Sequence, residues 1–338
     1  MSIPSNLIDQ ATFKCQYSPV FVIGMNGSGT TMLADSLGHH PDLYMFPLES
    51  KVLPYYLLHQ GSFGDLNTLD ARRQLALALT KSRAYIQAND ETRVGLSDEQ
   101  LERPGFDGVV DALYRVFAAK QGKTRWGDKS PINTQHVAAL AVSFPTAQFV
   151  HIIRDGRDAA QSFHRRWGYD PLHTITRWKW DVSAARVQGK VLGSDRYLEV
   201  RYEALTRDPS NEMQRICSFL GLQFNESVLH SSMLYMDPGN TQAATGRIVP
   251  NSEKWRTYFS AKQIQAIEEI AGAKLSGLGY PVSIRGNQSP SKAKLCYWKL
   301  KDGWSFTVWF FREFGLHAMP VYFRYIRNAV RQWASSWH

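Results

Sequence analysis

The sequence has few cysteines, and none has a spacing typical of a bridge or a metal site. Three occur in 338 residues, at Cys15, Cys217 and Cys296. The absence of any CxxC pattern argues against a zinc centre. An odd number of widely separated thiols argues against a disulfide scaffold and favours a reducing compartment. We therefore expect no metal site and a cytoplasmic protein.

Long apolar runs and acidic residues are also scarce. No run approaches the roughly 18 apolar residues of a membrane-spanning helix. The N-terminal segment, residues 1–18, lacks the apolar core of a signal peptide. Lysine and arginine total 39 against 30 aspartates and glutamates, a net charge of +9. This excess suits an anionic ligand, an acidic polymer or an anionic membrane surface, although a solvated basic surface without a role is equally compatible.

A further absence concerns the loop "GMNGSGTT" at residues 24–31, which follows the apolar run "PVFVI". It has the outline of a phosphate-binding loop, but GxxxxGK[ST] requires lysine at position 30, where Thr30 stands. Its glycines permit close backbone approach, and the N-terminus of a following helix attracts phosphate. An ATP γ-phosphate would lack its usual lysine here. A structural turn without a ligand is the alternative. The candidate ligand-binding residues are Asn26, Gly27, Ser28, Gly29, Thr30 and Thr31.

Strand and helix patterns alternate along the chain. Apolar runs predict strands at 19–24, at "FVHII" within 145–167, and at 195–205. Helical periodicity predicts helices from Thr30 to Leu37, from near Pro47, over most of 64–120, and over 208–221. This alternation indicates an α/β fold with a P-loop-like parallel β-sheet flanked by helices. Ligands in such sheets bind beyond the carboxyl ends of the strands.

A second polar turn, "RDGRD", follows the "FVHII" strand and supplies cations through Arg154 and Arg157. In the helix behind it, Ser162 and Arg166 are spaced i, i+4 and share a face, with Arg165 beside them. Arginine binds phosphate through a planar fork of donors. An ordinary charged surface helix is the alternative. Two anion-binding turns at two strand ends predict a ligand with two separated phosphate groups.

These motifs resemble the sulfotransferases that use 3′-phosphoadenosine 5′-phosphosulfate (PAPS). "GMNGSGTTML" is similar to their 5′-phosphosulfate loop. "RDGRDAAQSFHRRW" is similar to their 3′-phosphate motif, which implies that Arg154 and Ser162 hold the 3′-phosphate. "RYEAL" implies that Tyr202 lies near the adenine, and "SEKW" nominates Lys254. The resemblance runs from about residue 19 to residue 256. "HHPDLYMFPLESKVLP" and "GDKSP" are most similar to tyrosylprotein sulfotransferases and related bacterial enzymes.

One position departs from the family pattern, because Gly27 stands where arginine or lysine is common. We expect Lys51 and Lys129 to supply the positive charge that Gly27 lacks. The resemblance implies that Glu49 is the catalytic base, although a carboxylate at a helix N-terminus would also fit its place. Lys129 is expected to stabilise the leaving group, or else to pair with Asp128 or Glu49. The alternative bases are His39 and His40, which we interpret as mainly structural.

The chain is expected to divide into an N-terminal segment (1–18), a catalytic domain (19–282) and a basic, aromatic C-terminal extension (283–338). From residue 292 onward, eight basic residues and thirteen aromatic ones accompany two acids. The extension is expected either to pack on the catalytic domain or a second subunit, or to lie in the inner face of a membrane.

The predicted activity is sulfuryl transfer from PAPS to an acceptor hydroxyl, with no metal and no nucleic-acid partner. A glycan or glycolipid is the favoured acceptor, and a peptide tyrosine is the alternative. Functions of another class are a P-loop kinase, which the loop's missing lysine disfavours, and a non-catalytic protein that binds anionic surfaces.

Overall fold

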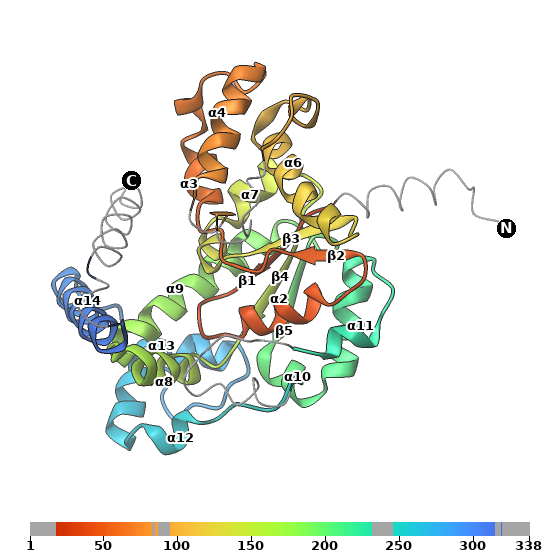
Figure 1. Cartoon of the computed structure of the whole chain (residues 1–338). Coiled ribbons are helices and arrows are strands. Elements are labelled where there is room, and N and C mark those ends of the chain that lie inside the picture. Colours follow the sequence, from red (N-terminus) through yellow and green to blue (C-terminus); the bar gives the residue numbers. More distant parts are fainter. Residues whose placement is uncertain (1–17, 83–84, 87–94, 232–245, 315–318, 320–338) are drawn as a thin grey trace. The chain divides into compact units, whose positions relative to one another are not determined.

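The computed structural model describes residues 18–82, 85–86, 95–231, 246–314 and 319 (Figure 1). The predicted N-terminal segment, except Ser18, lies outside these ranges. So does the sequence after Met319, with Trp333 and Trp337.

Five parallel strands form one sheet in the order β2-β3-β1-β4-β5. The strands are β1 (Val20–Ile23), β2 (Leu43–Met45), β3 (Arg125–Lys129), β4 (Gln148–Ile153) and β5 (Tyr197–Arg201). β1 pairs with β3 on one side and with β4 on the other. The order of the strands reverses beside β1, which is where ligands bind in such sheets. β1 continues into the Gly-rich loop and β4 continues into Arg154.

The core has one layer on each face of the sheet, and β1 contributes to both. Phe21 and Ile23 pack in one cluster, whereas Val20 and Val22 pack in the other. This alternation follows from the two-residue period of a strand, and all four side chains are fully buried. The predicted α/β fold with a parallel sheet between helices is confirmed.

Helices cover both faces of this sheet. The first cluster includes residues of α3 (Leu53–Leu58), α4 (Leu69–Thr80), α6 (Gly105–Lys120) and α7 (Val137–Ser143). The second includes residues of α2 (Thr30–Gly38), α10 (Tyr202–Arg207) and α11 (Pro209–Leu220). The helices predicted to begin at Thr30 and to span 208–221 are therefore confirmed.

Two sequence predictions need correction, and one strand was missed. The helix expected from near Pro47 begins only at Leu53, so residues 47–52 form an irregular segment. The strand expected over 195–205 ends at Arg201, and α10 begins at the next residue, Tyr202. β2 was not predicted, because three residues are too few to show a two-residue period.

The chain divides into two compact units, each made of two segments. The first comprises Met1–Ile153 and Val182–Asn251, and the second comprises Arg154–Asp181 and Ser252–His338. The second contains α8 (Gly156–Trp167), the beginning of α9 (Pro171–Lys190), α12 (Trp255–Tyr258), α13 (Ala261–Gly277) and α14 (Lys292–Phe314). Ser283 N–H donates to Glu268 of α13 (2.8 Å), so the polar segment that starts there is bonded within this unit. The domain edges expected at 18/19 and 282/283 stay predictions.

The C-terminal extension is helical over α14. One face of α14 packs against its own unit, with Trp298 and Asp302 buried. Asp302 accepts from the backbone N–H of Asp170 (2.7 Å) and pairs with His173 (2.6 Å). Within the described part of the chain, every helix is too short or too polar to cross a bilayer.

Candidate functional site

The Gly-rich loop leads from β1 into the N-terminus of α2. Gly29 occupies the N-cap position with φ 94°, a left-handed conformation that glycine adopts without strain. Gly29 has no side chain to cap the helix, so the first N–H groups of α2 are open to an anion. The hydroxyl of Ser28 is buried and has no hydrogen-bond partner among the described residues. The loop thus offers backbone and hydroxyl donors that suit a phosphate or sulfate group.

Tyr202 supports this loop. A Cβ atom added to Gly29 would lie 2.5 Å from Cδ2 of Tyr202, so the ring packs directly on the glycine. Tyr202 is the first residue of α10 and is 3% exposed. Tyr202 therefore lies beside the predicted ligand-binding loop. Its contact with the adenine stays a prediction.

Lys129, the last residue of β3, joins the loop helix to Glu49. Its ammonium group lies 3.2 Å from Thr31 Oγ1 and 3.2 Å from Glu49 Oε1. Lys51 approaches the other carboxylate oxygen of Glu49 at 3.0 Å. Burial alone would raise the pKa of Glu49, but Lys129 and Lys51 outweigh it and lower the pKa below its ordinary value. The structure therefore brings together the three residues predicted to be catalytic, and places a cation beside the loop despite Gly27.

A buried network holds the segment that carries Glu49 and Lys51. Asp128 is fully buried and accepts hydrogen bonds from Tyr114 (2.8 Å) and Asn133 (2.8 Å). The hydroxyl of Ser50 lies 3.0 Å from that of Ser130, which also accepts from Lys51 N–H at 3.1 Å. Lys51 has φ 57°, a conformation that side chains other than glycine rarely adopt. The hydrogen bond that Lys51 N–H donates to Ser130 Oγ stabilises this strained backbone.

Two alternative interpretations of this region are excluded or weakened. Glu49 is not in the first turn of a helix, since the N-cap of α3 is Val52. His39 and His40 lie at the opposite end of α2 from the loop, about 13 Å away at 1.5 Å per residue. There they bind the carbonyls of Asp35 and Gln223, respectively. Both histidines are structural, as expected, and Lys129 pairs with Glu49 rather than with Asp128.

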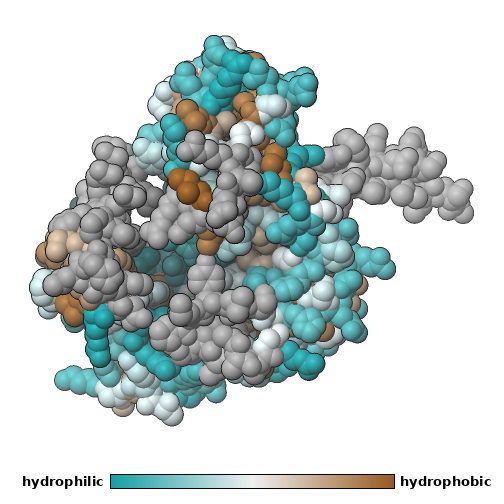
Figure 2. All heavy atoms as spheres, viewed as in Figure 1, coloured by the Kyte–Doolittle hydropathy of each residue, from teal (hydrophilic) through white to brown (hydrophobic). Residues whose placement is uncertain are grey.

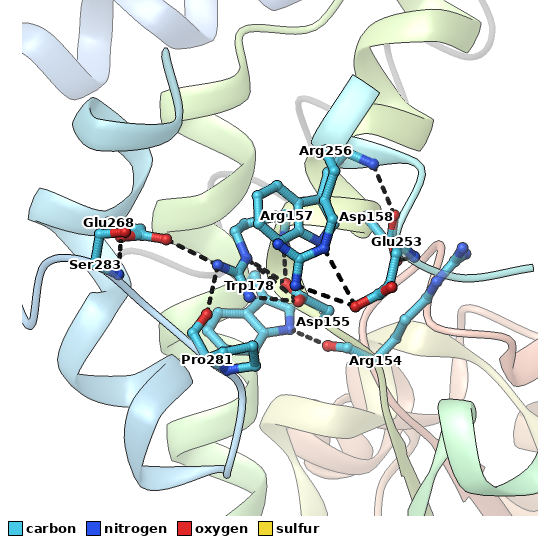
Figure 3. Close-up of polar contacts among 11 residues, drawn as sticks. Arg154, Asp155, Arg157, Asp158, Trp178, Glu253, Arg256, Glu268, Pro281 and Ser283 are labelled. Carbon is cyan, nitrogen blue, oxygen red and sulfur yellow. Dashed lines mark hydrogen bonds and ion pairs between the residues drawn. The ribbon is translucent and has the colours of Figure 1, made fainter. Parts of the chain in front are cut away.

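In the second unit, Arg157 has a structural role, which corrects the expectation that it would bind an anion. It is 1% exposed and pairs with Asp155 (2.8 Å) and Glu268 (2.8 Å). Its guanidinium also stacks on the ring of Trp255, 3.8 Å from the centroid. Figure 3 shows this cluster, with the side chain of Arg154 directed away from it. Arg154 is instead positioned through its backbone carbonyl, which accepts from Trp178 Nε1 at 3.0 Å.

Asp158 fastens the segment that carries Lys254. Its two carboxylate oxygens accept from the backbone N–H groups of Glu253 (2.7 Å) and Trp255 (3.1 Å) on either side of the lysine (Figure 3). Glu253 has φ 62° and shares with Lys51 the rare left-handed conformation. The buried carboxylate thus holds a strained turn that presents Lys254.

Three cations gather at this turn. Burial lowers the pKa of Lys254, and the positive charges of Arg165 and Arg154 lower it further. Such clustering of like charge in one place is typical of an anion-binding site. Arg165 was not among the predicted binding residues. Its position in the same motif, one residue before Arg166, is the sequence signal that could have identified it. Ser162 and Arg166 lie on α8 as expected and are partly exposed.

Replacing Asp158 by asparagine should destabilise this turn. An amide NH₂ cannot accept a hydrogen bond, so one buried N–H loses its partner at a cost of about 1–3 kcal/mol. We expect a lower melting temperature in thermal denaturation. Asp195→Asn, at an exposed position, is the matched control. An unchanged melting temperature in Asp158→Asn would show that Asp158 does not hold this turn.

Comparison with known proteins gives one family. The model of the "Sulfotransferase family" matches residues 19–226. A protein-tyrosine sulfotransferase 2 of Gallus gallus is 27% identical over 81% of this chain and 73% of the relative. The nodulation protein NoeE of Sinorhizobium fredii is 25% identical over 78% of this chain and 66% of the relative. Among solved structures, the sulfotransferase domain of the Synechococcus olefin synthase matches with a TM-score of 0.50 at 23% identity, over 75% of this chain and 94% of that domain.

Proposed function

Because this chain belongs to the sulfotransferase family, we propose that it transfers the sulfuryl group of PAPS to an acceptor hydroxyl. The observation that carries the proposal is the match of residues 19–226 to the sulfotransferase family, and the positive charges of Arg154 and Arg165 beside Lys254 agree with it. A second phosphate, distinct from the one at a Gly-rich loop, is what such a cluster would bind. The kinase alternative has no support, since the family match covers the loop and Thr30 replaces the P-loop lysine.

We assign the 5′-phosphosulfate to the loop of the first unit. The open N–H groups of α2 and the unpartnered hydroxyl of Ser28 would accept the anion. Lys129 is already hydrogen-bonded to Thr31 at the start of α2, so it supplies the charge that Gly27 does not. Asn26, Thr30 and Thr31 complete the predicted binding loop.

We assign the 3′-phosphate to the second unit, through Arg154, Ser162 and Lys254, with Arg165 and Arg166 nearby on α8. Burial lowers the pKa of Lys254 most, and an anion at this cluster would offset the positive charges of Arg165 and Arg154 that lower it further. ATP carries no 3′-phosphate and would leave the cluster without a ligand.

Glu49 and Lys129 would perform the chemistry. The acceptor oxygen attacks sulfur, the bond from sulfur to the 5′-phosphate oxygen breaks, and Glu49 takes the proton of the acceptor hydroxyl. Lys129 would then neutralise the charge on the departing phosphate oxygen. In the structure Lys129 pairs with Glu49 and lowers its basicity. A ligand that draws Lys129 away would raise the pKa of Glu49 and make it a better base.

For the acceptor we propose a glycan or glycolipid hydroxyl, with a peptide tyrosine as the second candidate. Similarity to proteins named protein-tyrosine sulfotransferases supports the second candidate, whereas the name of the nodulation protein specifies no acceptor. Incubation with radiolabelled PAPS and panels of oligosaccharides, glycolipids and tyrosine peptides, read by mass spectrometry, separates them. Absence of transfer to any hydroxyl acceptor would contradict the proposed activity.

Calorimetry tests the cosubstrate directly. We expect tight binding of 3′,5′-adenosine bisphosphate (PAP) and little binding of ATP. Arg154→Ala should lose one charge-assisted contact, about 1.5–3 kcal/mol, which is roughly ten- to a hundredfold in PAP affinity. Arg207→Ala, at an exposed arginine on α10, is the matched control and should bind as the unaltered protein does. Equal affinities for PAP and ATP would overturn the cosubstrate assignment.

A further inference from the structure

Helix α14 has two apolar faces, and only one of them is packed. Trp298 (3% exposed) and Phe310 (9%) are buried in the second unit. A second set of large apolar side chains is exposed, and we call it the outer stripe. Its members are Tyr297 (62%), Leu300 (70%), Trp304 (71%) and Val308 (50%).

The outer stripe is continuous along the helix. At 100° per residue its four positions fall within about 80° of arc, nearly opposite Trp298 and Asp302. Apolar side chains are visible on the surface of α14 in Figure 2, on the left of the view. Single exposed apolar residues are ordinary, but four in one line with a tryptophan among them indicate a contact surface.

The charges on α14 indicate what kind of surface it contacts. Lys294, Lys301 and Arg312 are exposed and lie along one edge of the outer stripe on the same helical projection. Lys301 also pairs with Asp170 at 2.8 Å. Among the described side chains of α14 the one acid is Asp302, which is buried and paired with His173. This edge of the outer stripe is therefore positively charged, as a surface that meets anionic lipid would be.

We propose that the outer stripe of α14 binds an anionic lipid surface, such as the inner face of a cell membrane. Leu300, Trp304 and Val308 would enter the boundary between headgroups and acyl chains, while Lys294, Lys301 and Arg312 meet the lipid phosphates. The buried face keeps α14 attached to its unit, so the enzyme binds the surface without spanning it. This proposal rests on α14 alone and does not depend on the reaction catalysed.

The test is flotation of the full-length protein with vesicles of phosphatidylglycerol and phosphatidylcholine. We expect the protein to float with them at low salt, less at high salt, and not with phosphatidylcholine alone. The double variant Leu300→Ser, Trp304→Ser should lower the partition coefficient by about tenfold or more, because the inserted apolar area is removed. The matched control is Leu77→Ser, Trp180→Ser, which alters a leucine (53%) and a tryptophan (45%) exposed on α4 and α9.

Three results would overturn the proposal. The unaltered protein could remain with the soluble fraction at low salt. The stripe variant could float as well as the control variant, which would place the contact in another part of the chain. Sedimentation could show a dimer that the stripe variant abolishes without any vesicle binding, which would make a second copy the occupant of the outer stripe. Thermal denaturation confirms that each variant is folded before flotation is measured.

Discussion

Glu49→Gln should reduce the rate of sulfuryl transfer by about 10²- to 10⁴-fold while the affinity for PAP changes little. Glutamine keeps the shape of the side chain, and its one carbonyl oxygen can accept a hydrogen bond from Lys129 or from Lys51, which contact different oxygens of Glu49. It has no proton affinity, so it cannot take the proton of the acceptor hydroxyl. Single-turnover transfer of label from PAPS gives the rate, and calorimetry with PAP gives the affinity.

Glu102→Gln, at an exposed position, controls for the change of charge alone. If Glu49→Gln keeps more than about a tenth of the unaltered rate, the base is a different residue. The histidines at the far end of α2 are poor substitutes, because both bind backbone carbonyls there.

Lys129→Met should lower kcat by about 10²- to 10³-fold, the usual effect of removing one donor that stabilises developing negative charge. Methionine preserves the length of the buried side chain but removes its ammonium group. The same change removes the largest influence that lowers the pKa of Glu49. The pKa of Glu49 should therefore rise, and the acid limb of the pH–rate profile should move to higher pH.

The loss of kcat at pH values where Glu49 is fully ionised distinguishes a lysine that stabilises the leaving group from one that only pairs with Glu49. A lysine that only pairs with Glu49 would move the acid limb and leave kcat above it unchanged. Lys81→Met, on the exposed end of α4, is the matched control for loss of a lysine. An unchanged kcat and an unchanged acid limb in Lys129→Met would remove Lys129 from the reaction.

Much of the fold could be predicted because local patterns determine it. β1 is a continuous apolar run and β4 is apolar at four of its last five positions, as is typical of strands buried on both faces, and α11 shows its buried positions at helical spacing. β2 could not be found in this way, since three residues carry too little pattern. The segment from Pro47 to Val52 looked helical locally. The hydrogen bond that Lys51 N–H donates to Ser130 Oγ, and the one between the hydroxyls of Ser50 and Ser130, hold it in another conformation.

The candidate site was predicted in part, and its errors come from distant contacts. Arg154 and Arg157 are alike in sequence, and nothing near them shows that Glu268 pairs with Arg157. A partner 111 residues away leaves no local signal. Arg165 and Arg166 are adjacent, so the choice between them depends on the rotation of α8 relative to Lys254. The pairing of Glu49 with Lys129, 80 residues apart, was one of two pairings left open for this lysine, and no local signal favoured Glu49 over Asp128.

The left-handed backbone at Lys51 and Glu253 has a consequence for how this protein can evolve. Each such conformation costs roughly 1–3 kcal/mol in a residue other than glycine. Selection for heat resistance alone would therefore favour glycine at both positions. Glycine at position 253 would be tolerated, because the hydrogen bond to Asp158 is donated by the backbone N–H of residue 253 and Lys254 is unchanged. Glycine at position 51 would not be tolerated in an active enzyme, because it would remove an ammonium group that lies 3.0 Å from Glu49. Relatives from hot environments should therefore often have glycine in place of Glu253, but should keep lysine at position 51.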